Sequence, residues 1–496
     1  MGEPRKPSKR GGGKPGKLRG GFREAEPRGA GRFSRPGPDQ GRPTSQRKPS
    51  DAARHRATTA LAKQMKRWPD LSLDVMRLNN LEARDAAFAQ AIYDAVISRA
   101  LTLKHLVEKG SKSEWDSLHP GVQATLLSGA AQLLILKRVP VRAALFESVE
   151  WAKREVSERS GGMVNAVLRR LDELIVRDED GVIEFRPTAT DRLDEIPMSD
   201  GSALVLREEV LPEDPLQRLS VTTSHPIALL RAWLKDHGMV ETRRLAMHGL
   251  ATPPVVLNVA FAKDELPQTL EMHQSPGHAV WTGSHEELSK LLKERRDLWV
   301  QDPASSLAVE SITNLAPSVV IDACAGLGTK TRQLTAAFPN AQIIATDIDE
   351  PRRATLERVF AKNDQVTVIE HEQLLDHAGR ADLVLLDVPC SNSGVLARRV
   401  EARYRFSSAR TESLVSTQRQ IVADAVRLLN RSSGQGSGRI LYSTCSLSHE
   451  ENEEISRWAA RWHGFTIEQE NRRSPSGGPG EEATTYSDGS YAALLA

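Results

Sequence analysis

Apolar runs that end in an acid or a cysteine recur through the C-terminal part of the chain. They are VVID up to Asp322, IIATD up to Asp347, LVLLD up to Asp387 and RILYST up to Cys445. Helical stretches, such as 353–362 and 417–429, separate the runs. This alternation is typical of parallel strands buried on both faces. It predicts a doubly wound, mostly parallel α/β sheet, and it places the residues after each strand at the edge where such sheets bind ligands.

Two of the three cysteines stand directly after such runs. A free cysteine is most often a small buried hydrophobe, and that interpretation stays open for Cys390 and Cys445. Their position at strand ends nevertheless favours thiol chemistry, since the working residues of open α/β sheets lie there. Cys324 lies in the run VVIDACAG, and we expect it to pack or to contact a ligand through its backbone.

Composition limits the class of protein. A chain of 496 residues with 39% hydrophobic and 27% charged residues should form two to four globular domains. It has no run of eighteen apolar residues and no apolar segment after Met1, which argues against a membrane span and a secretory signal. Three cysteines without C-x-x-C spacing make neither a disulfide framework nor a zinc site. We expect a cytoplasmic protein, monomeric and without a metal.

Residues 1–57 form a distinct N-terminal tail. Its first 50 residues hold fourteen Lys or Arg against four acids and are rich in Gly and Pro. Such a segment buries too little apolar surface to offset its ordering entropy, so we expect it to be disordered. A flexible cationic arm suits a polyanion, with RNA as the natural candidate, and a simple solubility tail is the alternative.

The remaining chain divides by pattern into four further segments. Apolar residues at helical spacing predict an all-α domain over 58–178. Residues 179–215 are acidic, with scattered apolar positions, and are interpreted as a linker. Residues 216–300 should form a small α+β unit, whose first helix starts at Ser224 with that residue as its cap. The α/β domain then covers 301–496.

A glycine-containing turn follows the first strand of this domain. Gly326 and Gly328 allow the backbone to approach a ligand closely, and Asp347, about twenty residues on, is placed to accept two ribose hydroxyls. A nicotinamide dehydrogenase has a similar fingerprint, but Thr331 replaces its third glycine and no residue pair for hydride transfer is evident. S-adenosylmethionine, an adenosyl cofactor without a pyrophosphate, fits better.

Several phrases resemble one family closely. WVQDPASSLAV, DACAGLGTKT, ATDID, LLDVPCSNSGVLARR and YSTCSLSHEENEE, in this order, are similar to the RsmB, NOL1/NOP2/Sun family of RNA cytosine-5 methyltransferases. The phrases LHPGVQATLL and GGMVNAVLRRL resemble the NusB-like RNA-binding domain. The resemblance covers roughly residues 60–496. It implies a Rossmann-like S-adenosylmethionine-dependent domain behind an all-α NusB-like domain and a small RNA-recognition subdomain, with small-subunit (16S) rRNA as the expected substrate.

The resemblance also implies roles for individual residues. Cys445 would add to C6 of cytosine, and Cys390 would promote release of the enzyme. Asp387 would hydrogen-bond the base unless it is a buried cap. Lys330 would orient the base or favour a thiolate unless it is a solvated lysine. The cofactor would contact Cys324, Ala325, Gly326, Leu327, Gly328, Thr329, Lys330, Asp347, Asp387 and, at the adenine side, Glu372.

The chain departs from the family pattern at three places. Gly326-Leu327-Gly328-Thr329 stands where Ala-Pro-Gly-Gly is usual, Glu372 takes the place of a Gly-Asp, and Ser490-Tyr491 replaces commoner aromatics. We expect weaker cofactor affinity and no lost catalytic group. The target cytosine should lie in a loop or be flipped from its stem. The alternatives are the same chemistry on tRNA and a non-catalytic RNA-binding ribosome assembly factor.

Overall fold

The computed structural model describes residues 51–71, 76–430 and 438–496. Most of the expected tail therefore lies outside the described residues. Its last residues are helical, because α1 begins at Ala52 with Asp51 accepting a hydrogen bond from the backbone of Arg54. The expected boundary at residue 58 thus falls inside a helix. Within the described residues, every helix is too short or too polar to cross a membrane.

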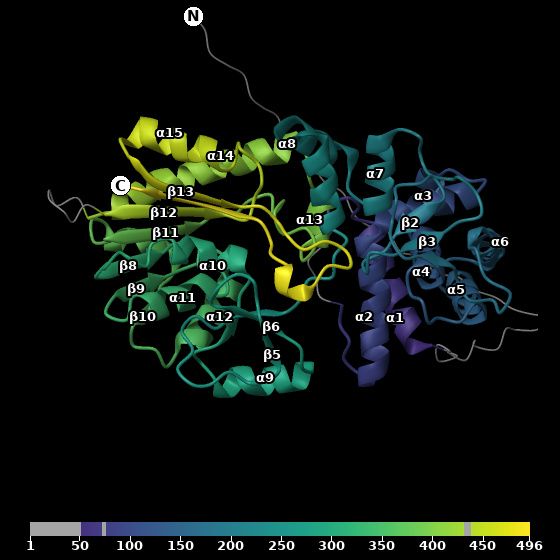
Figure 1. Ribbon diagram of the computed structural model, residues 1–496, viewed down its shortest axis with the longest axis horizontal. Coiled ribbons are helices and arrows are strands. Elements are labelled where there is room, and N and C mark those ends of the chain that lie inside the picture. The colour runs from purple at the N-terminus through teal and green to yellow at the C-terminus, as the bar shows by residue number, and fades with distance from the viewer. Residues whose placement is uncertain (1–50, 72–75, 431–437) are drawn as a thin grey trace, which may run out of the picture. The chain divides into compact units, whose positions relative to one another are not determined.

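The helical domain is built around α4, which is buried on nearly all of its faces. An apolar surface all round a helix requires neighbours on every side, and α1, α2, α3, α5 and α6 pack against α4 (Figure 1). The helices are α1 (Ala52–Met65), α2 (Ala83–Ser98), α3 (Ala100–Gly110), η1 (Trp115–Ser117), α4 (Pro120–Leu134), α5 (Val141–Glu155) and α6 (Glu158–Leu174).

The expected linker at 179–215 contains a folded sheet, so that interpretation was wrong. Strands β1 (Phe185–Arg186), β2 (Glu195–Pro197) and β3 (Ala203–Val205) pair antiparallel in the order β1-β3-β2. Ile196 and Leu204 are buried in the core of the helical domain. Strands of two or three residues are too short to show an alternating pattern, which is why the apolar positions looked scattered.

The next segment is a small α+β unit. It contains a four-stranded antiparallel sheet in the order β5-β6-β4-β7, with its own apolar core around Leu257, Ala279 and Leu298. Its elements are α7 (Pro215–Thr223), α8 (Ile227–His248), β4 (Val256–Asn258), β5 (Leu270–Met272), β6 (His278–Trp281), α9 (His285–Glu294) and β7 (Trp299–Val300).

Ser224 does not cap the helix that follows it, contrary to the prediction. It ends α7 in the left-handed conformation, with φ 59°, and α8 begins later, at Ile227. The Ser224 hydroxyl accepts hydrogen bonds from the backbone N–H groups of Leu101 and Thr102 in the first turn of α3, at 2.8 and 3.3 Å. Those N–H groups have no partner within their own helix, so a serine distant in sequence caps α3.

The C-terminal domain confirms the predicted mostly parallel α/β fold. Its seven strands lie in the order β10-β9-β8-β11-β12-β14-β13, with β14 antiparallel to both its neighbours. The elements are α10 (Pro303–Glu310), β8 (Val319–Asp322), α11 (Thr329–Ala337), β9 (Gln342–Ala345), α12 (Glu350–Phe360), β10 (Val366–Val368), η2 (His371–His377), β11 (Leu383–Asp387), α13 (Val400–Tyr404), α14 (Ser408–Ala425), η3 (Val426–Leu428), β12 (Arg439–Thr444), α15 (Glu453–His463), β13 (Ile467–Arg473), η4 (Ala483–Thr485) and β14 (Ser490–Leu495).

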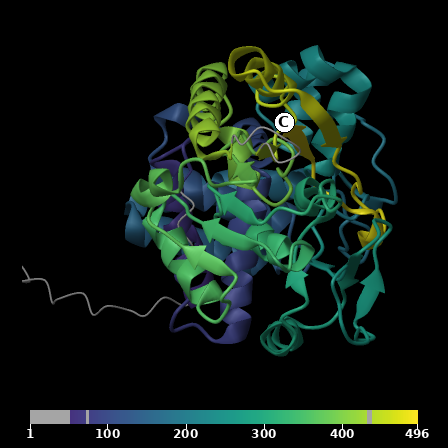
Figure 2. The same cartoon turned by 90° about the vertical axis from the view of Figure 1, so that its left-hand side faces the viewer.

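Helices cover both faces of this sheet (Figures 1 and 2). Helices α14 and α15 pack over one face, and α10, α11 and α12 over the other. Neighbouring residues of β11 point to opposite faces of the sheet. Leu386 is buried in the apolar core on one face, and Leu385 in the core on the other. Burial on both faces explains why the strands read as continuous apolar runs in the sequence.

Helix α13 joins the α/β domain to the preceding helices. Arg403 is fully buried and donates hydrogen bonds to the backbone carbonyls of Ser98, Thr223, Gly249 and Leu396, at 2.9 to 3.4 Å. Tyr404 donates from its hydroxyl to the carbonyl of Ile97, at 2.6 Å. One short helix therefore satisfies carbonyls from α2, α7 and the end of α8.

Replacing Arg403 by alanine is expected to lower the free energy of unfolding by about 3 kcal/mol, because several buried carbonyls lose their donor at once. The milder Tyr404→Phe removes one hydrogen bond and should cost about 1 kcal/mol. Urea unfolding followed by tryptophan fluorescence measures both. An Arg403→Ala midpoint equal to that of the wild type would show that water replaces the guanidinium.

Candidate active site at the carboxyl ends of four strands

The predicted site residues gather where the strand order reverses. Strands β9, β8, β11 and β12 are neighbours in the sheet, and their carboxyl ends lead to Asp347, Cys324, Asp387 and Cys445. The direction of the order changes between β8 and β11, which is the position at which open α/β sheets bind their ligands. Glu372 is exposed on η2, the element that follows the outer strand β10.

The loop between β8 and α11 has the backbone of a ligand cradle. Gly326 and Gly328 both have positive φ, 57° and 88°. A Cβ on Gly328 would lie 2.6 Å from the Phe360 ring, whereas one on Gly326 would meet open space. The neighbouring Leu327 is exposed, and Thr329 begins α11. The loop thus presents backbone at the N-terminus of a helix, where N–H groups are unpaired.

Asp347 holds this loop from the neighbouring strand. Its Oδ2 accepts a hydrogen bond from the N–H of Gly326, at 2.9 Å, and its Oδ1 accepts one from the N–H of Asp349, also at 2.9 Å. The side chain is nearly buried, while the next residue, Ile348, is 78% exposed. A carboxylate has lone pairs beyond these two bonds, so Asp347 keeps acceptor capacity for hydroxyl groups.

Lys330 and Asp387 form an ion pair between α11 and β11. The Lys330 Nζ lies 2.7 Å from Asp387 Oδ2, and the lysine side chain is the more buried of the two. Burial alone would lower the pKa of Lys330, because it disfavours the charged ammonium. Nearby negative groups, Asp387 above all, favour the charge, and the net effect is a raised pKa. Lys330 therefore stays cationic, and it is not the solvated surface lysine that was the alternative.

Two further groups beside this pair are buried. Asp322, at the end of β8, accepts from the Thr331 hydroxyl at 2.7 Å, while its second oxygen has no partner. Burial raises the pKa of Asp322 to about 7, although the Thr331 hydrogen bond opposes this. Burial likewise raises the pKa of the Cys324 thiol far above its usual range. A thiol of that kind is a poor nucleophile.

The other two thiols face each other. The Sγ atoms of Cys390 and Cys445 are 3.1 Å apart, and the Cys445 thiol also lies 3.4 Å from the Asn392 Oδ1. The hydrogen bond with Cys445, together with burial, raises the pKa of the Cys390 thiol well above its usual range. Sequence analysis had placed both cysteines at strand ends; their direct contact follows from the pairing of β11 with β12.

Sequence analysis missed two residues beside the thiols. Asn392, with φ 60°, donates to the carbonyl of Cys390 at 2.9 Å and accepts from Cys445. Glu451 is fully buried behind both cysteine loops. For Glu451, the sequence offered one signal, the phrase HEENEE that follows Cys445. Its charged residues are typical of a solvated surface, so the buried acid did not stand out.

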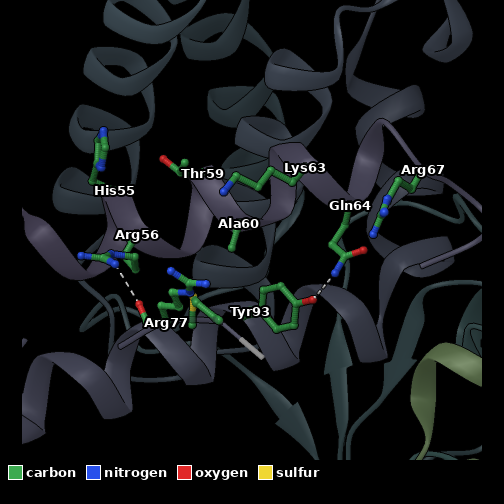
Figure 3. A pocket seen from close by; sticks show the side chains of 10 residues that line it. His55, Arg56, Thr59, Ala60, Lys63, Gln64, Arg67, Arg77 and Tyr93 are labelled. Atoms are coloured by element: carbon green, nitrogen blue, oxygen red, sulfur yellow. Dashed lines mark hydrogen bonds between the residues drawn. The ribbon is translucent and has the colours of Figure 1, made fainter. Parts of the chain in front are cut away.

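A second, cationic pocket of about 1060 Å³ lies on the helical domain, between α1 and the segment that leads into α2. His55, Arg56, Lys63, Arg67 and Arg77 line it together with Thr59, Ala60, Gln64, Met76 and Tyr93. Figure 3 shows Arg56 donating to the carbonyl of Arg77, at 2.8 Å, and Gln64 donating to the Tyr93 hydroxyl. None of the lining residues that the structure describes is an acid, so the pocket suits an anionic ligand.

Known proteins share both parts of this architecture. Residues 313–475 match the family model described as 16S rRNA methyltransferase RsmB/F, and residues 52–173 match the NusB family. The ribosomal RNA small subunit methyltransferase B of Vibrio cholerae is 28% identical over 433 residues, 84% of this chain and 90% of that protein. Its Pseudomonas syringae namesake is 26% identical over 397 residues, 76% and 80% of the two chains. The crystal structure of the protein PH0851 has the same fold, with a TM-score of 0.62, 18% identity and coverage of 89% and 98%.

The sheet order, the glycine loop and these matches define an S-adenosylmethionine-dependent methyltransferase with a Rossmann-like α/β domain. The helical domain in front of it is a NusB domain. Residues 313–475 match the RsmB/F methyltransferase family, as the motifs had suggested, and relatives named small subunit methyltransferase B match most of the chain.

The residues present fit this cofactor. Gly326, with positive φ and open space beside it, leaves room for a ligand against the backbone, and Asp347 retains acceptor capacity for ribose hydroxyls. Leu327, in the glycine loop, and Ile348, next to Asp347 in the chain, expose apolar side chains. Within the described residues, no cluster of three or more histidine, cysteine or acidic side chains could hold a metal ion.

Proposed function

We propose that the protein is an RNA cytosine-5 methyltransferase that acts on small-subunit (16S) rRNA. The observation that carries this proposal is the contact of two thiols, Cys390 and Cys445, beside the Lys330–Asp387 pair. Transfer to an oxygen or an exocyclic nitrogen needs no thiol, whereas cytosine C5 is a poor carbon nucleophile that must be activated at C6. The relatives named small subunit methyltransferase B support the choice of rRNA.

In the proposed mechanism, the Cys445 thiolate adds to C6 of the cytosine and the ring becomes nucleophilic at C5. Asp387, placed by Lys330, hydrogen-bonds the base edge and stabilises the adduct. Bound S-adenosylmethionine supplies an electrophilic methyl group. After C5 has been methylated, its proton passes to a water molecule, the electrons of that C–H bond re-form the C5–C6 double bond, and the C6–S bond breaks so that Cys445 leaves as a thiolate. Cys390, which touches Cys445, assists this release.

RNA contacts are proposed for the parts in front of the catalytic domain. The cationic pocket on α1 lies close to the basic segment 1–50 in sequence, and together they suit an RNA backbone. The α+β unit over 216–300 is proposed to position the target loop, from which the cytosine is flipped out. We further propose that the protein works in the cytoplasm as a monomer. The proposed boundaries of the catalytic domain are residues 301–496.

Transfer of labelled methyl from S-adenosylmethionine to total RNA from a strain lacking the protein tests the function. We expect the label in small-subunit rRNA, and in 5-methylcytosine after digestion to nucleosides. Label in tRNA would keep the chemistry and change the substrate. Absence of label in every RNA, despite cofactor binding, would contradict the proposal and favour a non-catalytic assembly factor.

Asp347→Asn is expected to raise the Kd for S-adenosylmethionine about tenfold, or about 1.4 kcal/mol. The amide has one acceptor oxygen instead of two, and its NH2 group would point at hydroxyl or N–H donors that need an acceptor. Isothermal titration calorimetry measures the affinity. Asp364→Asn, an exposed change on the loop after α12, is the control and should leave the Kd unchanged. A Kd for Asp347→Asn equal to that of the control would show that the ribose binds elsewhere.

A further inference from the structure

Glu451 is a buried acid in the catalytic domain to which the proposed mechanism gives no part. Its side chain has no exposed surface. Oε1 accepts hydrogen bonds from the N–H of Ser391, at 2.8 Å, and from the Gln418 amide, at 3.1 Å. Oε2 accepts from the hydroxyls of Ser391 and Ser446, each at 2.5 Å. A buried carboxylate needs such a set of donors, because it cannot donate itself.

The partners of Glu451 are the residues that follow the two cysteines. Ser391 comes directly after Cys390, on the loop from β11, and Ser446 comes directly after Cys445, on the loop from β12. A single carboxylate oxygen therefore joins both loops. Gln418, on α14, also donates to the carbonyl of Pro389, at 3.0 Å, so the first loop is held from its other side too.

Charged groups interact with both thiols. The Glu451 carboxylate interacts electrostatically with Cys390 and disfavours its thiolate, whereas the Lys330 ammonium interacts with Cys445. Arg405 and Arg410 line the same pocket as Cys390, and Tyr442, whose hydroxyl donates to the backbone carbonyl of Glu451 at 2.6 Å, also interacts with this thiol. Burial raises the pKa of Tyr442 well above its usual range, so it brings no charge.

We propose that Glu451 is a positioning residue that holds the two cysteine loops together and makes their thiols unequal. Its negative charge adds to burial and to the Cys445 contact, which together keep Cys390 as a neutral thiol that cannot compete with Cys445 for C6 of the base. Its hydrogen bonds to Ser391 and Ser446 keep the two sulfur atoms within contact distance. The inference rests on the proposed function only in naming Cys445 as the nucleophile.

Timed alkylation of the full chain with iodoacetamide, without RNA or cofactor, tests the charge effect. Peptide mass spectrometry gives the separate rates for Cys390 and Cys445. We expect Cys445 to react at least about tenfold faster in the wild type, because burial and the contact with Cys445 keep Cys390 as a neutral thiol. Glu451→Gln should narrow this ratio by about threefold through faster reaction of Cys390, since burial and the Cys445 contact remain. The matched control is Glu450→Gln, the exposed neighbour, which should behave as the wild type.

Ser446→Ala separates the charge effect of Glu451 from its role in holding the loops. It also provides a test if Glu451→Gln does not fold. It removes one hydroxyl from the carboxylate but leaves the charge beside Cys390. We expect the alkylation ratio to stay near the wild-type value, while kcat for methyl transfer falls about tenfold and the KM for RNA stays constant. A ratio that collapses in Ser446→Ala would show that the charge of Glu451 is not the cause.

Two results with Glu451→Gln would overturn the inference. An unchanged alkylation ratio in a variant with the wild-type melting temperature would remove the charge effect. Equal acceleration of Cys390, Cys445 and Cys324 would show that Glu451 only supports the fold. Failure of the proposed function looks different: the wild type would then label no RNA, whereas the alkylation ratios would still follow Glu451.

Discussion

Methyl transfer to RNA is expected to fall by at least about 10³-fold when Cys445 is replaced by alanine, since the covalent route through C6 is lost. The side chain lies at the end of β12, touches Cys390 and makes no contact that holds the sheet together. The variant should therefore keep its melting temperature and its affinity for S-adenosylmethionine. Labelled methyl transfer to small-subunit RNA, measured under single turnover, gives the loss.

The control for this experiment is Glu450→Gln, which changes an exposed charge near the same loop. It should transfer methyl groups at the wild-type rate. A Cys445→Ala enzyme that retains a tenth or more of the activity would mean that C5 is not activated by this thiol. The proposal of a cysteine adduct would then be wrong, although the family assignment would stand.

Replacing Cys390 by alanine should have the second largest effect, and of a different kind. Cys445 can still add to the base in this variant, but its release is slow. We therefore expect a covalent protein–RNA complex that survives denaturation, and a turnover rate lowered by about 10²-fold or more. Denaturing gel electrophoresis with labelled RNA measures the complex. In the structure, the two sulfur atoms are already in contact, so Cys390 can act without a large movement.

The double variant Cys390→Ala/Cys445→Ala is the matched control for the trapped complex. It should form none, because the nucleophile is absent. A complex that persists in the double variant would identify another attacking group, whereas a Cys390→Ala enzyme that turns over normally would show that release needs no second thiol.

The catalytic sheet was predictable because its strands are buried on both faces. A continuous apolar run such as LVLLD indicates a buried strand without any knowledge of its neighbours. The acids and cysteines that end these runs mark the edge of the sheet at which the site forms. The fold class and the cofactor followed from these runs and from the glycine loop. The roles given to Cys445, Cys390 and Asp387 remain predictions, since they come from resemblance and chemistry.

Other features depend on contacts that no local pattern contains. The strands within 179–215 are too short for a period, and Ser224 caps α3, a helix far away in the chain. Glu451 reads as one more acid in HEENEE, because only the pairing of β11 with β12 puts both cysteine loops beside it. Asn392 depends in the same way on a left-handed turn that brings its side chain to Cys445.

The position of β14 has a consequence for how the protein is made. Residues 490–495 lie between β12 and β13 and pair with both, so β12, which leads to Cys445, is an edge strand until they arrive. A ribosome that has just translated Cys445 holds a nascent chain with an open sheet and an unpaired strand. The catalytic end of the sheet can close only after residues 490–495 have left the exit tunnel, although Cys445 itself is translated well before them.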